Sequence, residues 1–290
     1  MTSGEHESEA MQPPAYLEEK LDDLLLPSNP RLVVVTHRRW MEPYHALEEG
    51  ELRARLTATR AHPQGFTLWL RQIALFQSAF NRGYDWSQEP NREVRKAVAF
   101  RLELLGLACG NAKLALDAAL AGFYSGAMAI ERHMLETWRR VAYARLSPED
   151  VWRWYPQTLW PDDILPAPDG GMPTSQPTAK EIARKIDERG SDWDKAYLPK
   201  VRSGFEILTD HAHPTLEGAT QTWDAIDPDR RVFGPTFSDP HCRRCLTWGL
   251  TTGAMLAEEI ALIDPQNEEW FAELASIAEQ LGPWLAAHQH

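Results

Sequence analysis

A run of more than 50 residues without proline, from Arg92 to Leu146, constrains the fold more than any other feature of the sequence. Alanine and leucine dominate this run, and both are strong helix formers. A proline inside a helix removes a backbone hydrogen bond and clashes with the preceding turn, so its absence permits long continuous helices. A break near residues 106–111 or at Gly122 divides the run. The sequence therefore predicts two long antiparallel helices here.

The remaining segments also favour helices. Residues 178–181 have the Thr-x-x-Glu pattern of a capping box, and Ser147-Pro148 reads as a second helix start. The residues 156–177 contain six prolines and predict a long loop. The β-branched run at residues 32–35 is a candidate strand or a buried connector. Further helices are predicted over residues 16–26, 44–60, 65–82 and 193–210, from 239 to about 263, and from 265 onwards.

These elements predict an all-α fold, a helical bundle with long antiparallel helices and one long proline-rich loop. We expect residues 1–14 to form a flexible tail. Residues 15–290 are expected to form a single helical domain, with its core at about residues 65–290.

Composition restricts the class of protein. Apolar residues make up 43% and charged residues 25% of the chain, as in ordinary globular proteins. No stretch reaches 18 apolar residues and the acidic N-terminus lacks a signal-peptide pattern, so we expect no membrane association. The net charge of −12 argues against DNA binding. Three cysteines do not suggest a disulfide framework and favour a reducing compartment, so a cytoplasmic protein of bacterial type is expected.

The 12 tryptophans are an unusually high number for this length. Most lie in apolar or helix-end contexts, where core packing explains them better than sugar binding. We expect an exposed tryptophan-rich face to join two copies of the chain as a homodimer.

The first candidate site motif runs from Gly122 to Glu136. Arg132 and Glu136 are four residues apart and share a helix face. Because Arg132 stands among apolar residues, we expect a buried guanidinium that requires a partner. Either it points into a polar cavity to hold an anion, or it forms a structural ion pair between helices. The small residues 122, 126 and 129 are expected to let another helix approach closely.

The second motif places two histidines, His211 and His213, at a helix end just before Pro214. They can ligate a metal, act as acid and base, or cap the helix C-terminus, where a protonated histidine is favourable.

The third motif is the pair Cys242 and Cys245, which follows His241. With His211 and His213, the pair can complete a tetrahedral zinc site. A redox pair at a helix start, where the dipole lowers a thiol pKa, is another alternative. A single Cys-x-x-Cys is a weak signal, so we favour two ordinary helix-face cysteines and no cofactor, with zinc as the alternative.

A fourth pattern, Arg39 to His45, fits the loose Arg-x(4–6)-His spacing of HEPN nucleases (higher eukaryotes and prokaryotes nucleotide-binding). The pattern is common by chance in a chain with 10 histidines, and Pro43 is expected to interrupt a helix there.

The segments from Ala119 to Glu136 and from Thr209 to Pro214 resemble a family of uncharacterised helical bacterial proteins. Its members carry an Arg-x-x-x-Glu helix and a later His-Pro element, and the resemblance covers about residues 92–215. It implies a helical core, a role in phage defence or stress, and no established reaction. Arg132, Glu136 and one of His211 and His213 would meet in a polar cluster. The doubled histidine and the Cys-x-x-Cys depart from the family pattern.

Three functions follow from these motifs, and the sequence does not decide whether the chain is an enzyme. The leading hypothesis is an interaction or defence-associated module, a homo-oligomer with a protein or RNA partner. The second is a HEPN-like, metal-independent ribonuclease, in which a histidine and Arg132 activate a ribose 2′-hydroxyl and stabilise the phosphate. The third is a zinc-binding helical protein that uses Cys242, Cys245 and the two histidines.

Overall fold

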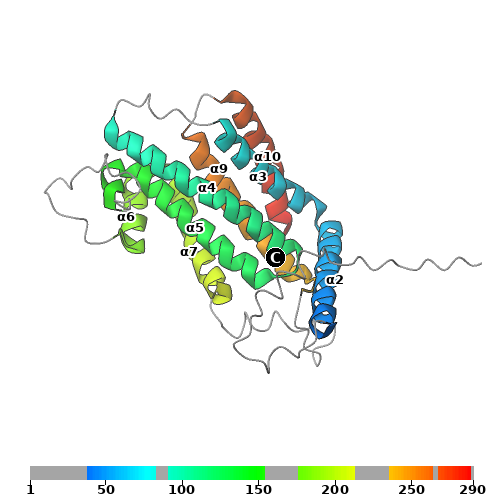
Figure 1. The fold of residues 1–290 in the computed structure, drawn as a ribbon. Helices are drawn as coiled ribbons and strands as arrows, with labels where there is room; N and C mark the ends of the chain where they lie inside the picture. The colour runs from blue at the N-terminus through cyan, green and yellow to red at the C-terminus, as the bar shows by residue number, and fades with distance from the viewer. Residues whose placement is uncertain (1–37, 83–90, 154–175, 213–234, 264–266, 289–290) are drawn as a thin grey trace, which may run out of the picture. The chain divides into compact units, whose positions relative to one another are not determined.

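The computed structural model describes residues 38–82, 91–153, 176–212, 235–263 and 267–288 (Figure 1). Within these ranges it describes only the backbone of residues 38–46, 82, 92–93, 152–153 and 210–212. The chain divides into two units, Met1–Glu48 and Glu49–His290. The packing described below is that of the second unit. The predicted tail, the helix at 16–26 and the strand at 32–35 lie outside the described residues, as does most of the proline-rich loop.

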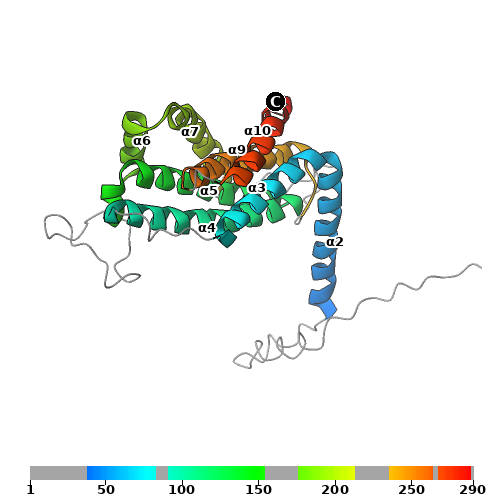
Figure 2. The same cartoon turned by 90° about the horizontal axis from the view of Figure 1, so that it is seen from above.

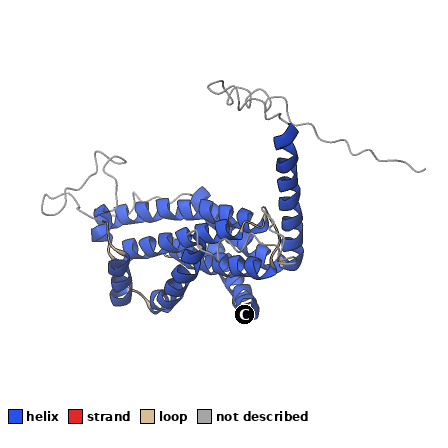
Figure 3. Cartoon of the chain, turned by 90° about the horizontal axis from the view of Figure 1, so that it is seen from below, coloured by secondary structure: helices blue, strands red, loops and turns tan. Residues whose placement is uncertain are grey.

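The described residues form eight α-helices and one short 3-10 helix, with no strand among them (Figure 3). The predicted all-α class is therefore confirmed. The elements are α2 (Arg38–Ala61), α3 (Pro63–Arg82), α4 (Arg92–Leu120), α5 (Tyr124–Leu146), η2 (Pro148–Arg153), α6 (Ala179–Arg189), α7 (Asp192–Ala212), α9 (Asp239–Ala261) and α10 (Glu268–His288).

The proline-free run forms a helical hairpin, and its break lies at Gly122 rather than near residues 106–111. Gly122 has a φ of +83°, which favours glycine, and a Cβ there would lie 2.6 Å from the carbonyl oxygen of Thr236. The turn thus needs glycine both for its backbone conformation and for the close approach of the segment before α9.

Helix α5 lies at the centre of the bundle and packs against α4, α6, α7 and α9 (Figures 1 and 2). It runs parallel to α9: the hydroxyl of Tyr124 accepts a hydrogen bond from the Ser238 amide at one end, and Arg145 pairs with Glu259 at the other. It runs antiparallel to α7, because Arg145 also pairs with Asp194 at the start of α7.

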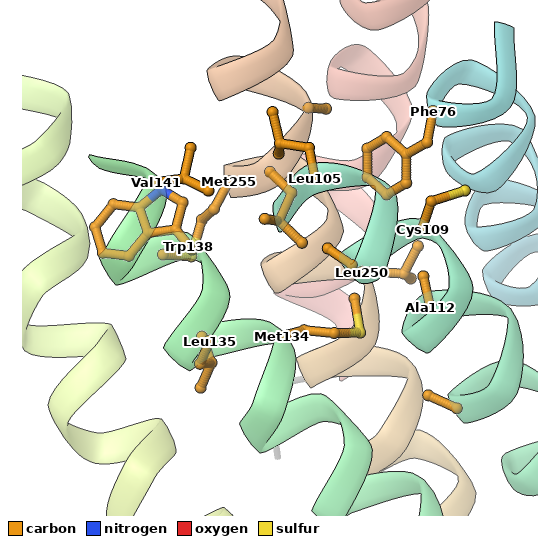
Figure 4. Packing of buried hydrophobic residues seen from close by; sticks show 14 of the residues in the cluster. Phe76, Leu105, Cys109, Ala112, Met134, Leu135, Trp138, Val141, Leu250 and Met255 are labelled. Carbon is orange, nitrogen blue, oxygen red and sulfur yellow. The ribbon is translucent and has the colours of Figure 1, made fainter. Parts of the chain in front are cut away.

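The core is a single cluster of apolar side chains from these helices (Figure 4). Trp138 and Leu135 of α5, Leu105 of α4 and Met255 of α9 are all buried in it. The described tryptophans support core packing, since five of six are buried or partly buried. The exception is Trp193, which is exposed, so no tryptophan-rich face is present among the described residues.

Among the described glycines, the one with the least room for a side chain is Gly249 of α9, not one of the small residues of α5. A Cβ on Gly249 would lie 2.2 Å from the ring of Trp69 of α3. A Cβ on Gly126, by contrast, would meet nothing within 4 Å. The expectation for residues 122, 126 and 129 is therefore wrong at Gly126, because this side of α5 faces away from the described helices.

Of the three sequence signals for helix starts and breaks, one is confirmed and two are wrong. The capping box is confirmed, since the Thr178 side chain accepts a hydrogen bond from the Glu181 amide at 3.2 Å. Ser147 instead ends α5, and its hydroxyl has no partner among the described residues, so Pro148 opens only a 3-10 helix. Helix α2 continues through Pro43, where an interruption was expected.

In the described ranges, no helix combines the length and the apolar character that a membrane span requires.

Candidate functional site

Arg132 and Glu136 share one face of α5, as predicted, and form an ion pair of 3.6 Å. The expected burial of Arg132 is wrong, because its side chain is 29% exposed and that of Glu136 is 34% exposed. The buried side of α5 passes through Met128, Glu131 and Met134, which leaves Arg132 at the edge of the helix interface. Its Nε atom is nevertheless shielded from solvent and has no hydrogen-bond partner among the described residues.

Two arginines of α5 lie over the ring of Phe205, which belongs to α7. The guanidinium carbons of Arg132 and Arg139 are 5.8 and 5.0 Å from the ring centroid. Cation–π contacts of this kind hold the planar guanidinium groups in place. Arg139 also donates a hydrogen bond of 2.6 Å to the carbonyl oxygen of Ala179, at the start of α6.

Positive charge is in excess around these side chains. Burial lowers the pKa of Arg139, and the neighbouring guanidinium groups of Arg140 and Arg202 lower it further, while Glu136 raises it. In the described part of the chain, Glu136 is the one carboxylate that pairs with any of the four arginines. We call this region the arginine surface, defined by Arg132, Arg139, Arg140 and Arg202 with Phe205 and Glu136.

The side chains of the two histidines of the second motif lie outside the described residues. His211 lies in the last turn of α7, where only the backbone is described, and His213 lies outside the described residues. Leu135 of α5 lies opposite Gly204 of α7, so the antiparallel register brings residue 211 level with about residue 128. The predicted meeting of a histidine with Arg132 and Glu136 is compatible with this register and stays a prediction.

Two other arginines of the described residues, the buried Arg101 and the partly buried Arg145, were missed by the sequence analysis. Arg101 of α4 donates to Glu259 of α9 at 3.0 Å, and Arg145 of α5 donates to the same carboxylate at 2.9 Å. Arg145 also donates to Asp194 of α7 at 2.6 Å. We call these four residues the buried ion cluster; it joins four helices and carries no net charge. No local motif marks it, because its members lie far apart in the sequence.

A second buried carboxylate, Glu131, is next to Arg132 in the sequence but points the other way. It is fully buried, and neither carboxylate oxygen has a hydrogen-bond partner among the described residues. Burial raises its pKa well above the ordinary glutamate range. Burial therefore disfavours the charged form of this carboxyl group. The apolar spacing Tyr124, Met128, Leu135 was the available signal that position 131 faces the core.

The two cysteines of α9 are buried, and their thiols are free. Burial, followed by the charge of Asp239, raises the pKa of Cys242 to about 12. Burial also raises the pKa of Cys245, and its sulfur lies 3.8 Å from the carbonyl oxygen of Tyr124. These shifts oppose the thiolate that redox exchange requires. The interpretation as ordinary helix-face cysteines agrees with this geometry.

Metal ligands do not gather elsewhere in the described residues, which contain no group of three or more histidine, cysteine, aspartate or glutamate side chains able to hold a metal ion. The zinc alternative also requires His211 and His213, whose side chains are outside the described set. The side chains from Arg39 to His45 are outside it as well, so the HEPN spacing stays untested.

Comparison of the chain with protein-family models, with curated proteins and with solved structures found no match. The resemblance to the helical bacterial family therefore remains a prediction.

Proposed function

We propose that the chain is a helical interaction module that binds a phosphate-bearing partner, RNA in the first instance, at the arginine surface. The observation that carries this proposal is the charge excess at Phe205. Arg132 and Arg139 of α5 lie over its ring, and Arg140 and Arg202 lie near enough to Arg139 to lower its pKa. Among the described residues, the carboxylate that forms an ion pair with one of these four arginines is Glu136. In a chain with a net charge of −12, such a local excess of fixed positive charge favours an anion.

Phosphate is the anion whose geometry best matches these groups. A guanidinium presents parallel N–H donors that bind two phosphate oxygens at once, and it stays charged even when partly buried. The ring of Phe205 and the Ala179 carbonyl hold Arg139 before a ligand arrives, which reduces the entropy lost on binding.

The second candidate function is catalysis, in which RNA bound at the arginine surface is the substrate. A ribonuclease needs a general base within hydrogen-bond reach of the ribose hydroxyl, in addition to cations near the phosphate. The register of α7 favours His211 for that role, because residue 211 lies about one helical turn from Arg132 along α5. Binding without cleavage distinguishes the interaction module from the ribonuclease.

The test is a binding titration with fluorescently labelled single-stranded RNA, in which the same samples are run on a gel for cleavage. The double variant Arg132→Gln with Arg139→Gln is expected to lose at least tenfold in affinity. The matched control is Arg184→Gln on α6, because Arg184 is exposed and already pairs with Glu188 at 2.7 Å. Equal affinity of the double variant and the wild-type chain refutes the proposal.

Cleavage that stops in a His211→Ala variant would replace the interaction module with the ribonuclease. If the arginine surface contacts RNA through its phosphate groups, millimolar inorganic phosphate should displace the bound RNA.

Further expectations belong to the same proposal. The chain is expected to act as a homodimer in the bacterial cytoplasm, in the phage defence or stress role that the family resemblance implies. Phage infection of cells that carry the wild-type gene or the double variant measures that role, and equal survival of the two strains contradicts it.

A further inference from the structure

Glu136 is the acidic member of the residues that define the arginine surface, and it is held loosely. Its Oε1 atom is 3.6 Å from the Nη2 atom of Arg132. Hydrogen bonds between a charged nitrogen and a carboxylate oxygen are about 2.7–2.9 Å long, so charge alone joins these two groups. The Oε2 atom of the same carboxylate is 3.7 Å from the Nδ1 atom of His133, whose side chain is 75% exposed. Arg132 therefore shares a carboxylate that it does not bind closely.

Other arginines of the molecule form closer pairs than Arg132 does. Arg184 of α6 donates a hydrogen bond to Glu188 at 2.7 Å, and Arg145 of α5 donates one to Glu259 at 2.9 Å. In the described part of the chain, Arg132 has the longer contact with Glu136, and its shielded Nε atom lacks a hydrogen-bond partner. The guanidinium of Arg132 thus keeps N–H donors that a ligand can use.

We propose that Glu136 is an internal competitor of the ligand, because its carboxylate lies on Arg132 where a phosphate of the ligand binds. This inference rests on the proposed function and adds a residue that sets the affinity of the same surface. Carboxylate and phosphate oxygens use the same N–H donors of a guanidinium, so the two anions compete for Arg132. A phosphate that binds there displaces the Glu136 carboxylate into solvent.

The ion pair is weak enough for a ligand to open it. The side chains of Arg132 and Glu136 are 29% and 34% exposed, and pairs of this kind change an equilibrium constant by about fivefold at most. The Arg132 guanidinium carbon lies 5.8 Å from the centroid of the Phe205 ring, a contact that does not involve Glu136. This cation–π contact keeps the guanidinium in place when the carboxylate leaves.

The experiment is the RNA titration described above with the variant Glu136→Gln, which removes the charge and keeps the size of the side chain. Its affinity for RNA is expected to be about fivefold higher than that of the wild-type chain. The matched control is Glu188→Gln, which removes the same charge from an exposed pair on α6, outside the arginine surface. Because salt screens distant exposed charges, this control should change the affinity by less than about twofold.

A cycle of single and double variants separates competition for Arg132 from a general effect of charge. In the Arg132→Gln background, the contested guanidinium is absent, so Glu136→Gln should raise RNA affinity no more than Glu188→Gln does. Circular dichroism should show wild-type helix content for every variant, because all three side chains are partly exposed.

Tighter RNA binding that depends on Arg132 supports the inference. If the wild-type chain binds RNA but Glu136→Gln binds no more tightly, or gains equally with and without Arg132, the inference is overturned and the proposed function stands. If neither the wild-type chain nor Glu136→Gln binds RNA, the proposed function and the inference are both overturned.

Discussion

Two groups of arginines in the molecule differ in how their charge is neutralised. In the buried ion cluster, Arg101 and Arg145 face the carboxylates of Glu259 and Asp194, so two positive charges meet two negative ones. On the arginine surface, four guanidinium groups have Glu136 as their one carboxylate partner among the described residues. A balanced cluster out of water serves to hold helices together, whereas an unbalanced one at the surface is suited to a ligand.

The largest expected effect of a substitution is at the buried ion cluster. Glu259→Leu leaves the buried Arg101 and the partly buried Arg145 with one carboxylate, Asp194, and should lower the free energy of unfolding by about 3–5 kcal/mol. Urea denaturation measures this change. The Arg184→Gln variant, which breaks an exposed pair on α6, should change it by less than about 1 kcal/mol. Near-equal stability of the two variants would show that the buried cluster does not join the helices.

The same substitution at the other buried glutamate, Glu131, is expected to raise the free energy of unfolding instead of lowering it. Glu131 has no hydrogen-bond partner among the described residues, so Glu131→Leu removes a buried polar group without breaking a pair. The free energy of unfolding should rise by about 1–3 kcal/mol at pH 7. Destabilisation as large as that of Glu259→Leu would indicate a partner for Glu131 that lies outside the described residues.

Arg132→Gln should separate stability from binding. The Arg132–Glu136 pair is partly exposed and 3.6 Å long, so its loss should cost about 1 kcal/mol or less of folding free energy. RNA affinity, in contrast, should fall several-fold in a binding titration. A variant that unfolds markedly more easily, yet binds RNA normally, would assign Arg132 to the structural group of arginines.

The smallest expected effect is a dependence on pH from Glu258, which borders the buried ion cluster. Burial raises its pKa to about 7; Glu259 and Asp194 raise it further, while the Tyr197 hydroxyl and Arg145 oppose the shift. Between the ordinary value of 4.5 and about 7, the folded chain binds this proton more tightly than the unfolded chain. Stability should therefore fall as the pH rises through that window.

Glu258→Gln should flatten this part of the stability curve, measured by thermal unfolding at a series of pH values. Glu131, whose pKa is also raised, makes stability fall with rising pH in the same way. The effect of Glu258→Gln is therefore also measured in a Glu131→Leu background, where this second contribution is absent. An unchanged slope in Glu258→Gln would contradict the raised pKa.

The sequence predicted the elements better than the contacts between them. The proline-free run, the capping box and the Asp239-Pro240 start located helices correctly, because these signals act within a few residues. The ion pair between Arg132 and Glu136 was predictable for the same reason. The buried ion cluster was not, because Arg101 and Glu259 are 158 residues apart and meet only through the packing of α4 against α9.

The error about Arg132 has a simple geometric origin. Glu131 and Arg132 are adjacent, and a helix turns by about 100° per residue, so one of them faces the core and the other its edge. The apolar composition around them did not distinguish the two. Assigning the phase of α5 from Tyr124, Met128 and Leu135 would have placed the carboxylate inside and the guanidinium outside.

The salt dependence of RNA affinity tests the central claim most directly. For single-stranded nucleic acid, the slope of log affinity against log salt concentration changes by about 0.7 for each phosphate neutralised. The variant Arg132→Gln with Arg139→Gln should therefore show a slope shallower than that of the wild-type chain by about 1.4, two phosphate contacts at about 0.7 each. The control Arg184→Gln should keep the wild-type slope. Identical slopes for the double variant and the wild-type chain would contradict the assignment of the arginine surface as a phosphate-binding site.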